Sequence, residues 1–213
     1  MADNQEPSTR ERILETAREA FIESGFDGAT VRSICGKAGA NVAAVNYHFG
    51  DKSGLYLAVL EAIVDDAFSS NPLELQEGAD AKEHLQCLVR SFLARIFHCH
   101  ERPEEEGERR LVAHALSTPS PALNVLVERY IRPMSNQLRD ILSRLLDMDK
   151  DHTVVWRCAK SVASQCLHYL YGLAMMRRLE PAEADNEDID EVSEHIVRFS
   201  LGGIRDIAEV SKR

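Results

Sequence analysis

Residues Asn41–Tyr47 combine small and hydrogen-bonding side chains and carry no bulky charges. An α-helix of this composition can enter the DNA major groove, where amide groups read base edges and small side chains allow a close approach. The surrounding run, Thr30–Lys52, has two short helical patterns that meet at Gly39. This layout is typical of a helix-turn-helix, which presents its second helix to DNA. The chemistry that the run predicts is therefore the recognition of double-stranded DNA.

Capping residues and apolar spacing predict the helices that hold this run. Ser8 and Glu11 have the spacing of a capping box, in which side chain and backbone satisfy each other at a helix start. Short helices are then expected to begin after each polar cap and to end at each glycine. A longer amphipathic segment follows as a connector. The expected caps and stops are, in chain order, Ser8, Gly25, Thr30, Gly39, Asn41 and Asp51.

Longer helical patterns dominate the chain beyond Asn71-Pro72, and no strand pattern occurs anywhere in the sequence. We therefore expect an all-α fold. Pro133 is expected to distort its helix, because it lacks an N–H donor and crowds the preceding turn, and Gly202-Gly203 to weaken the last helix. The acidic segments 102–107 and 180–190 are expected to be loops. The expected long helices cover residues 82–100, 109–116, 122–146, 153–179 and the region around 196–207.

The chain is acidic, with a formal net charge of −10 over 213 residues. This charge excludes a protein that coats nucleic acid through bulk electrostatics. The segment before Leu60 is not basic either, because acidic side chains outnumber Lys and Arg there. Any DNA binding must therefore rest on the placement of a few cations.

Other classes of site find little support. The five cysteines are odd in number and form no CxxC pair, which favours reduced thiols in a cytoplasmic protein. No signal-peptide layout or membrane-spanning apolar run is present, so we expect no membrane partner. His98 and His100, two apart on a helix, point to different sides and predict no metal site. Without a Gly-rich phosphate loop, HExxH or nucleophile elbow, we expect no enzyme and no cofactor.

A series of short motifs runs in order through Thr9–Phe68. They are Ala20-Phe21, Gly25-Phe26, Thr30-Val31-Arg32-Ser33-Ile34, Ala38-Gly39, Tyr47-His48-Phe49, and Lys52 with Leu55-Tyr56. In this order and spacing the segment resembles the DNA-binding domain of the TetR family of bacterial transcriptional regulators. The resemblance implies a helix-turn-helix domain over residues 1–54. It also implies a connector helix and a helical ligand-sensing and dimerisation domain over residues 55–213.

The resemblance also implies which residues contact DNA. Thr30 would offer its hydroxyl and nearby backbone amides to a phosphate, and Arg32 would reach a phosphate or a base edge. His48 and Lys52 look like phosphate contacts. The implied contact residues are Thr30, Arg32, Asn41, Ala43, Ala44, Asn46, Tyr47, His48 and Lys52.

Two of these positions leave alternatives open. Asn46 is an amide where relatives often have an aromatic residue, and Asn can form a bidentate pair with adenine that discriminates by about 1–3 kcal/mol. The alternative for Asn46 is a phosphate contact or simple exposure to solvent. Tyr47 either reads a base or packs locally, with only its hydroxyl reaching a phosphate.

Motifs in the second part of the chain look like the CecR-like branch of the same family. They are Ser120-Pro121-Ala122-Leu123, Tyr130-Ile131-Arg132-Pro133 and Ser164-Gln165-Cys166-Leu167. In such regulators the last two long helices pair with those of a second subunit, and apolar residues on both sides of Val162–Met176 fit that role. A two-fold dimer would present two recognition helices about 34 Å apart to a palindromic operator.

Several side chains could line a cavity for a small-molecule effector, although Met and aromatic residues at helical spacing are more often core residues. The preferred hypothesis is a homodimeric repressor that an inducer releases from its operator. The alternatives are an all-α dimeric adaptor that binds a protein partner without DNA and, less favoured, a helical enzyme. The candidate effector-binding residues are Phe92, Ile96, His100, His114, Gln165, His168, Tyr169 and Met175.

Overall fold

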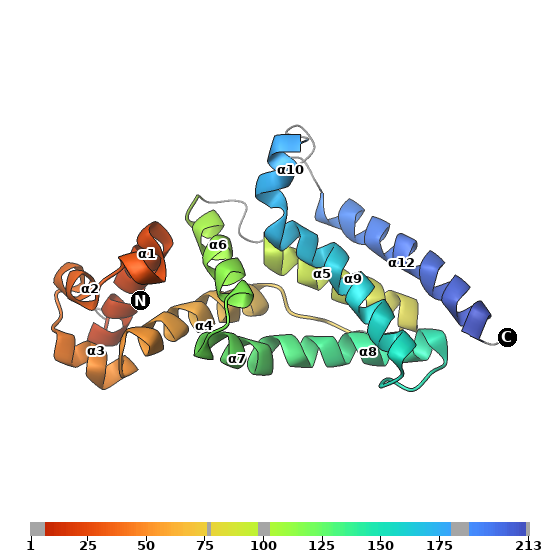
Figure 1. The fold of residues 1–213 in the computed structure, drawn as a ribbon, viewed down its shortest axis with the longest axis horizontal. Helices are drawn as coiled ribbons and strands as arrows, with labels where there is room; N and C mark the ends of the chain where they lie inside the picture. The colour runs from red at the N-terminus through yellow and green to blue at the C-terminus, as the bar shows by residue number, and fades with distance from the viewer. Residues whose placement is uncertain (1–6, 76–77, 98–102, 180–187, 212–213) are drawn as a thin grey trace, which may run out of the picture. The chain divides into compact units, whose positions relative to one another are not determined.

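The computed structural model describes residues 7–75, 78–97, 103–179 and 188–211. Within these ranges the regular elements are all helices and none is a strand, which confirms the expected all-α fold (Figure 1). In chain order they are α1 (Thr9–Gly28), α2 (Val31–Ala38), α3 (Val42–Phe49), α4 (Lys52–Ser70), α5 (Ala81–Phe97), α6 (Pro103–Ser117), α7 (Pro121–Leu126), the π-helical turn η2 (Val127–Ile131), α8 (Arg132–Leu146), α9 (Thr153–Tyr171), α10 (Leu173–Leu179) and α12 (Ile189–Ser211).

The helices form two compact units. The first contains α1, α2, α3, α6 and α4 up to Ala67, together with α7 up to Asn124. The second contains the remainder of α4 and α7, and α5, η2, α8, α9, α10 and α12. No helix in the described ranges is both long and apolar enough to cross a lipid bilayer.

The first unit begins with the expected capping box. The Ser8 amide donates to the Glu11 carboxylate at 2.7 Å, and the Glu11 amide donates to the Ser8 hydroxyl at 3.3 Å. Apolar faces of α1, α2, α3 and α4 then meet in a core that includes Ile13, Ile34 and Val45. At Gly25 the backbone of α1 takes φ 68° and ψ 178°. Only glycine adopts that conformation readily, so the regular part of α1 ends where the sequence predicted.

The second unit is held by one apolar core to which α5, α8, α9 and α12 contribute. Each of these helices turns one apolar stripe inward and leaves a polar or mixed face outside, as amphipathic helices in a bundle do. The largest fully buried side chains of this unit are Leu85, Leu93, Leu126, Ile141, Leu142 and Leu146.

Two expected boundaries are wrong. The segment 102–107 is not a loop throughout, because α6 already begins at Pro103; proline suits the first turn of a helix, where its missing N–H would have no partner anyway. The helix expected over 153–179 is divided at Gly172 into α9 and α10. A Cβ at Gly172 would lie 2.6 Å from the His168 carbonyl oxygen, so the tight bend needs glycine.

The region around Pro133 behaves as its chemistry predicts. The preceding turn is the π-helical η2, in which the Arg132 amide donates to the Val127 carbonyl. Proline has no N–H to donate, and the wider π-helical turn allows the helix to continue past it without that hydrogen bond. The last helix, α12, continues through Gly202-Gly203 without a break. Residues 98–102 and 180–187, which hold the expected end of the 82–100 helix and most of the acidic loop, lie outside the described residues.

Candidate nucleic-acid interface

The turn between α2 and α3 has the caps that the sequence predicted. The Ser33 amide donates to the Thr30 hydroxyl at 3.1 Å, and Gly39 ends α2 in the left-handed conformation with φ 61°. The Ala44 amide donates to Asn41 Oδ1 at 2.8 Å. These contacts fix the start of both helices and the angle between them. Because capping uses Asn41 Oδ1, the side chain of Asn41 offers DNA mainly its Nδ2 donors.

Helix α3 is anchored through one side and exposed on the other. Val45 is fully buried in the core of the first unit. Ala43, Asn46 and His48 are exposed, and Tyr47 has 85% of its surface accessible. An aromatic side chain that remains this exposed gains little from folding, so its apolar ring is available to a partner. Of the predicted recognition-helix contacts, Ala44 is half-buried and the others lie on the exposed side of α3 or at its cap.

The amino-terminal end of α2 adds hydrogen-bond donors. The first amides of a helix have no intrahelical acceptor, and together with the helix dipole they favour a bound anion. Thr30 and Arg32 at this end are both exposed. Arg32 makes no ion pair with any residue in the described ranges. Its guanidinium is therefore not neutralised by a carboxylate of that part of the chain.

Lys52 is positioned by an aromatic cluster. Its Nζ lies 4.5 Å from the centre of the Phe26 ring, a cation–π contact that limits where the ammonium group can move. Phe26 packs against Phe21 and Tyr56, with 5.0 Å between the Phe26 and Tyr56 ring centres; burial raises the pKa of the Tyr56 hydroxyl. The Gly54 amide donates to Asp51 Oδ1 at 2.8 Å and caps the same end of α4. Lys52 thus stands beside a helix start that itself favours anions.

Two residues that the sequence did not single out belong to this surface. The guanidinium of Arg10 in α1 lies 5.3 Å from the centre of the Phe49 ring, which places a cation next to the end of α3. A Cβ at Gly54 would lie 2.0 Å from the Phe49 carbonyl oxygen, so α4 approaches α3 as closely as it does only because residue 54 is glycine. Sequence spacing gave no sign of either contact, because each joins two different helices.

The remaining cations of α1 are committed to structural roles. Arg12 donates to the Ala38 carbonyl at 3.3 Å and to the Pro7 carbonyl at 2.9 Å, tying α1 to the end of α2. Arg18 Nε donates to Glu108 of α6 at 2.6 Å, and Glu108 is only 7% exposed. The exposed cations of the interface are therefore few, in agreement with the acidic composition.

The second unit contains an apolar cavity with a volume of about 160 Å³. It is bounded by α5, α8 and α9, with Ile131 of η2, and Lys160 is the one cationic side chain among its lining residues. Trp156, the only tryptophan of the chain, also lines it. Phe92, Met134 and Ala163 also line it.

Of the candidate effector-binding residues that the structure describes, only Phe92 lines this cavity. Ile96 is buried without lining it, and Gln165 Nε2 donates to the Ser200 hydroxyl of α12 at 3.0 Å. Tyr169 packs on Phe97. His114, which belongs to the first unit, is exposed, and so are His168 and Met175. His100 lies outside the described residues.

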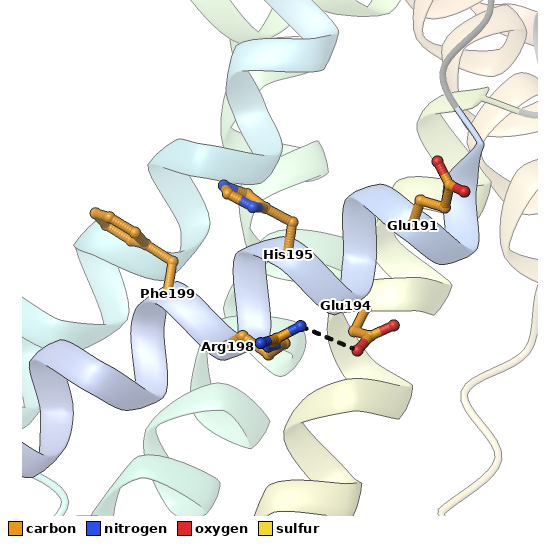
Figure 2. Close-up of a pocket in the computed structure, with 5 residues that line it drawn as sticks. All are labelled: Glu191, Glu194, His195, Arg198 and Phe199. Atoms are coloured by element: carbon orange, nitrogen blue, oxygen red, sulfur yellow. Dashed lines mark ion pairs between the residues drawn. The ribbon is translucent and has the colours of Figure 1, made fainter.

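The outer face of α12 carries both charged and apolar side chains. Figure 2 shows His195 and Phe199 projecting from it next to each other, and their rings stack with 6.3 Å between centres. Arg198 and Glu194, one helical turn apart, form an ion pair of 3.7 Å. These residues and Glu191 line a hollow of about 440 Å³ that opens to solvent. In the described residues no group of three or more His, Cys, Asp or Glu side chains could hold a metal ion.

Both parts of the chain match known families. Residues 13–59 match the family described as bacterial regulatory proteins of the tetR family. Residues 81–204, more than half of the chain, match the C-terminal domain of the HTH-type transcriptional dual regulator CecR. The matched families consist of transcriptional regulators and not of enzymes.

Individual relatives repeat this pattern. The HTH-type transcriptional repressor AcnR of Corynebacterium glutamicum is 43% identical over 58 residues, which are 27% of this chain and 31% of AcnR. CecR of Shigella flexneri is 23% identical over 151 residues, 68% of this chain and 67% of CecR. The crystal structure of FadR from Bacillus subtilis in complex with stearoyl-CoA has a TM-score of 0.65 at 14% identity, over 90% of this chain and 97% of FadR. The chain thus spans about a third of AcnR, and its likeness to FadR is one of fold.

Proposed function

We propose that this chain, which belongs to the TetR family of DNA-binding transcriptional regulators and carries the CecR-type C-terminal domain, is a homodimeric repressor that a small molecule releases from a palindromic operator. In this proposal residues 1–54 bind DNA, and residues 55–213 dimerise and bind the effector. The observation that carries it is the exposed side of α3, held by the buried Val45 and by capped turns.

Base recognition in this proposal comes from α3 and phosphate contacts come from its surroundings. Asn46 and Tyr47 face the base edges, and Ala43 allows the close approach. Arg32, His48 and Lys52 contact phosphates, and Arg10 is added to them because it lies beside the end of α3. So few cations give weak nonspecific binding in a chain of net charge −10. Specific binding therefore needs two half-sites occupied at once, which a dimer provides.

Exposed apolar side chains support dimerisation through α9, α10 and α12. On α12, Phe199, Ile207 and Val210 recur at helical spacing, and Phe199 is 69% exposed. Tyr171 at the end of α9 and Met175 of α10 are exposed as well. A soluble monomer rarely leaves stripes of this kind in water. Pairing α9 and α12 with the same helices of a second copy would bury these side chains in a four-helix interface.

Release by an effector requires that the ligand bind the two states of the dimer differently. The apolar cavity of the second unit is the candidate binding site. FadR of Bacillus subtilis, which shares the fold, was crystallised with stearoyl-CoA. We infer that this chain also responds to a small apolar or amphipathic molecule.

The test begins with operators selected from random DNA by the wild-type protein. We expect the selected sites to be two-fold symmetric, with half-sites about 34 Å apart. Changing Tyr47→Ala and Lys52→Gln together should reduce operator affinity at least a hundredfold and leave the dimer intact. Loss of one phosphate contact per subunit should also lower the salt dependence of binding.

Lys82→Gln is the matched control, because it removes the same charge from an exposed position of α5. It should change operator affinity by less than threefold. If no sequence-selective complex forms, or if the double variant binds as the wild type does, the proposed DNA interface is wrong.

A further inference from the structure

Arg95 of α5 is a half-buried cation with poor partners. Its Nε donates to the Asn71 carbonyl at 3.1 Å. One terminal nitrogen lies 3.4 Å from the thioether sulfur of Met134, which is a weak acceptor. The guanidinium carbon lies 3.9 Å above the centre of the Phe68 ring. All four residues belong to the second unit.

No carboxylate offsets this burial within the described residues. Arg95 has no ion pair there, and burial lowers the pKa of its guanidinium from the usual value. Arginine nevertheless stays protonated in proteins. A desolvated cation without a counter-ion is costly, and a protein usually offsets that cost with an anion. Two other half-buried arginines show the usual solution: Arg18 pairs with Glu108, and Arg139 pairs with Asp151.

Met134 connects the apolar cavity with this cation, which is not itself among the lining residues. Met134, which touches Arg95, also lines the cavity, and Phe92, another lining residue, lies three positions before Arg95 on the same helix. Residues three apart in a helix share a face, so Arg95 lies on the side of α5 that turns to the cavity. The volume of about 160 Å³ is close to that of an engineered cavity of about 150 Å³ that binds benzene. It therefore suits an apolar group of about six carbon atoms.

We propose that the second unit binds a small carboxylate whose apolar body, about six carbon atoms long, fills this cavity while its carboxylate pairs with Arg95. This inference rests on the proposed function only in taking the cavity as the effector site. Planar guanidinium and carboxylate groups match in geometry and form two parallel hydrogen bonds. The ring of Phe68 holds the guanidinium plane in place for that contact. The ligand would supply the counter-ion that Arg95 lacks.

Lys160 is the competing cation, because it too lines the cavity and lies one helical turn after Trp156. Lys160 is exposed, however, so water already solvates its ammonium group. A carboxylate gains less from an exposed ammonium than from a half-buried guanidinium. We therefore assign the carboxylate to Arg95, and the experiment distinguishes the two.

The probes are heptanoate, 1-heptanol and heptylamine, which share one chain length and differ in charge. Binding to the full-length protein is followed by the fluorescence of Trp156, which lines the cavity and is the only tryptophan. We expect heptanoate to bind at least tenfold more tightly than 1-heptanol, and heptylamine more weakly than both. Arg95→Gln should weaken heptanoate binding at least tenfold and leave 1-heptanol binding unchanged.

Three further variants complete the test. Arg90→Gln is the matched control, since it changes the same residue type on the same helix in an exposed ion pair, and it should leave heptanoate affinity unchanged. Ala163→Phe should block both heptanoate and 1-heptanol by filling the cavity, with circular dichroism verifying the fold. Lys160→Gln should weaken heptanoate binding less than threefold.

Each outcome bears on one claim. Equal binding of the three probes, loss of heptanoate binding in Lys160→Gln in place of Arg95→Gln, or no response of Trp156 would overturn the carboxylate assignment. Operator binding is measured separately. If heptanoate binds through Arg95 but does not affect the operator complex, the carboxylate site is supported. The same result would show that ligand binding at this site does not control operator binding. Operator binding with no heptanoate binding would leave the regulator proposal standing and refute the carboxylate site.

Discussion

Gly54 determines how closely the first turn of α4 approaches the end of α3, so Gly54→Ala is the sharpest perturbation of the DNA-binding geometry. The new Cβ would lie 2.0 Å from the Phe49 carbonyl oxygen and 3.2 Å from its carbon, whereas Cβ atoms essentially never come within 3.0 Å of another atom. Both neighbours are backbone atoms, so no side-chain rotation relieves the clash. Helix α4 and the end of α3 must separate by about 1 Å, a distance at which a hydrogen bond to a base is lost.

The free energy of unfolding should fall by about 1–3 kcal/mol, the usual cost of overpacking, even though alanine favours a helix by about 1 kcal/mol over glycine. Unfolding of a fraction of the protein will itself lower the apparent operator affinity. Beyond that loss, affinity should fall at least a further tenfold, because displacement of α3 weakens base contacts worth about 1–3 kcal/mol each. Urea unfolding and fluorescence anisotropy of labelled operator measure the two effects.

Gly36→Ala is a control that should change the free energy of unfolding in the opposite direction. Gly36 is exposed within α2, and a Cβ there would meet nothing within 4 Å. Alanine should raise the free energy of unfolding by about 0.5–1 kcal/mol, because it loses less backbone freedom on folding. If Gly54→Ala is as stable as Gly36→Ala and binds the operator as the wild type does, the argument from close helix approach is refuted.

Three further predictions concern other parts of the chain. Phe199→Glu should convert the dimer to a folded monomer in sedimentation velocity, because it places a charge in the apolar stripe of α12; an unchanged dimer would remove α12 from the interface. Arg18→Met should lower the free energy of unfolding in urea by about 1–3 kcal/mol, since Glu108 loses a charged hydrogen bond, whereas the exposed pair lost in Arg90→Gln should cost less than about 1 kcal/mol. Burial raises the pKa of the Cys166 thiol to about 12, so iodoacetamide should label half-exposed Cys87 before Cys166 in the native protein at pH 8. The folded-state pKa lies above the unfolded value of 9.0, so this thiol's contribution to stability is full below pH 9 and is lost as the pH rises towards 12; faster labelling of Cys166 would contradict its burial.

Local signals in the sequence were sufficient for the first unit. The caps at Ser8, Thr30 and Asn41 and the stop at Gly39 act within a few residues, and the structure has each of them. Such features depend on backbone hydrogen bonds between near neighbours, which composition and spacing reveal.

Contacts between distant segments were not predictable in this way. Helical periodicity indicates that apolar residues such as Phe92 face the core of the second unit. It does not indicate which of these core-facing residues surround a cavity. The half-buried state of Arg95 depends on Asn71 and Met134, which are distant in sequence.

Base reading by α3 is tested most directly by repeating the selection from random DNA with Asn46→Ala and comparing the resulting operator with that of the wild type. We predict a two-fold symmetric operator for both proteins, with specificity lost in the variant at one base pair of each half-site. The lost discrimination should amount to about 1–3 kcal/mol, the value of one bidentate amide–adenine pair. An operator whose base preferences are identical for the two proteins would contradict base reading by Asn46. A wild-type protein that selects no sequence at all would contradict DNA recognition by α3 altogether.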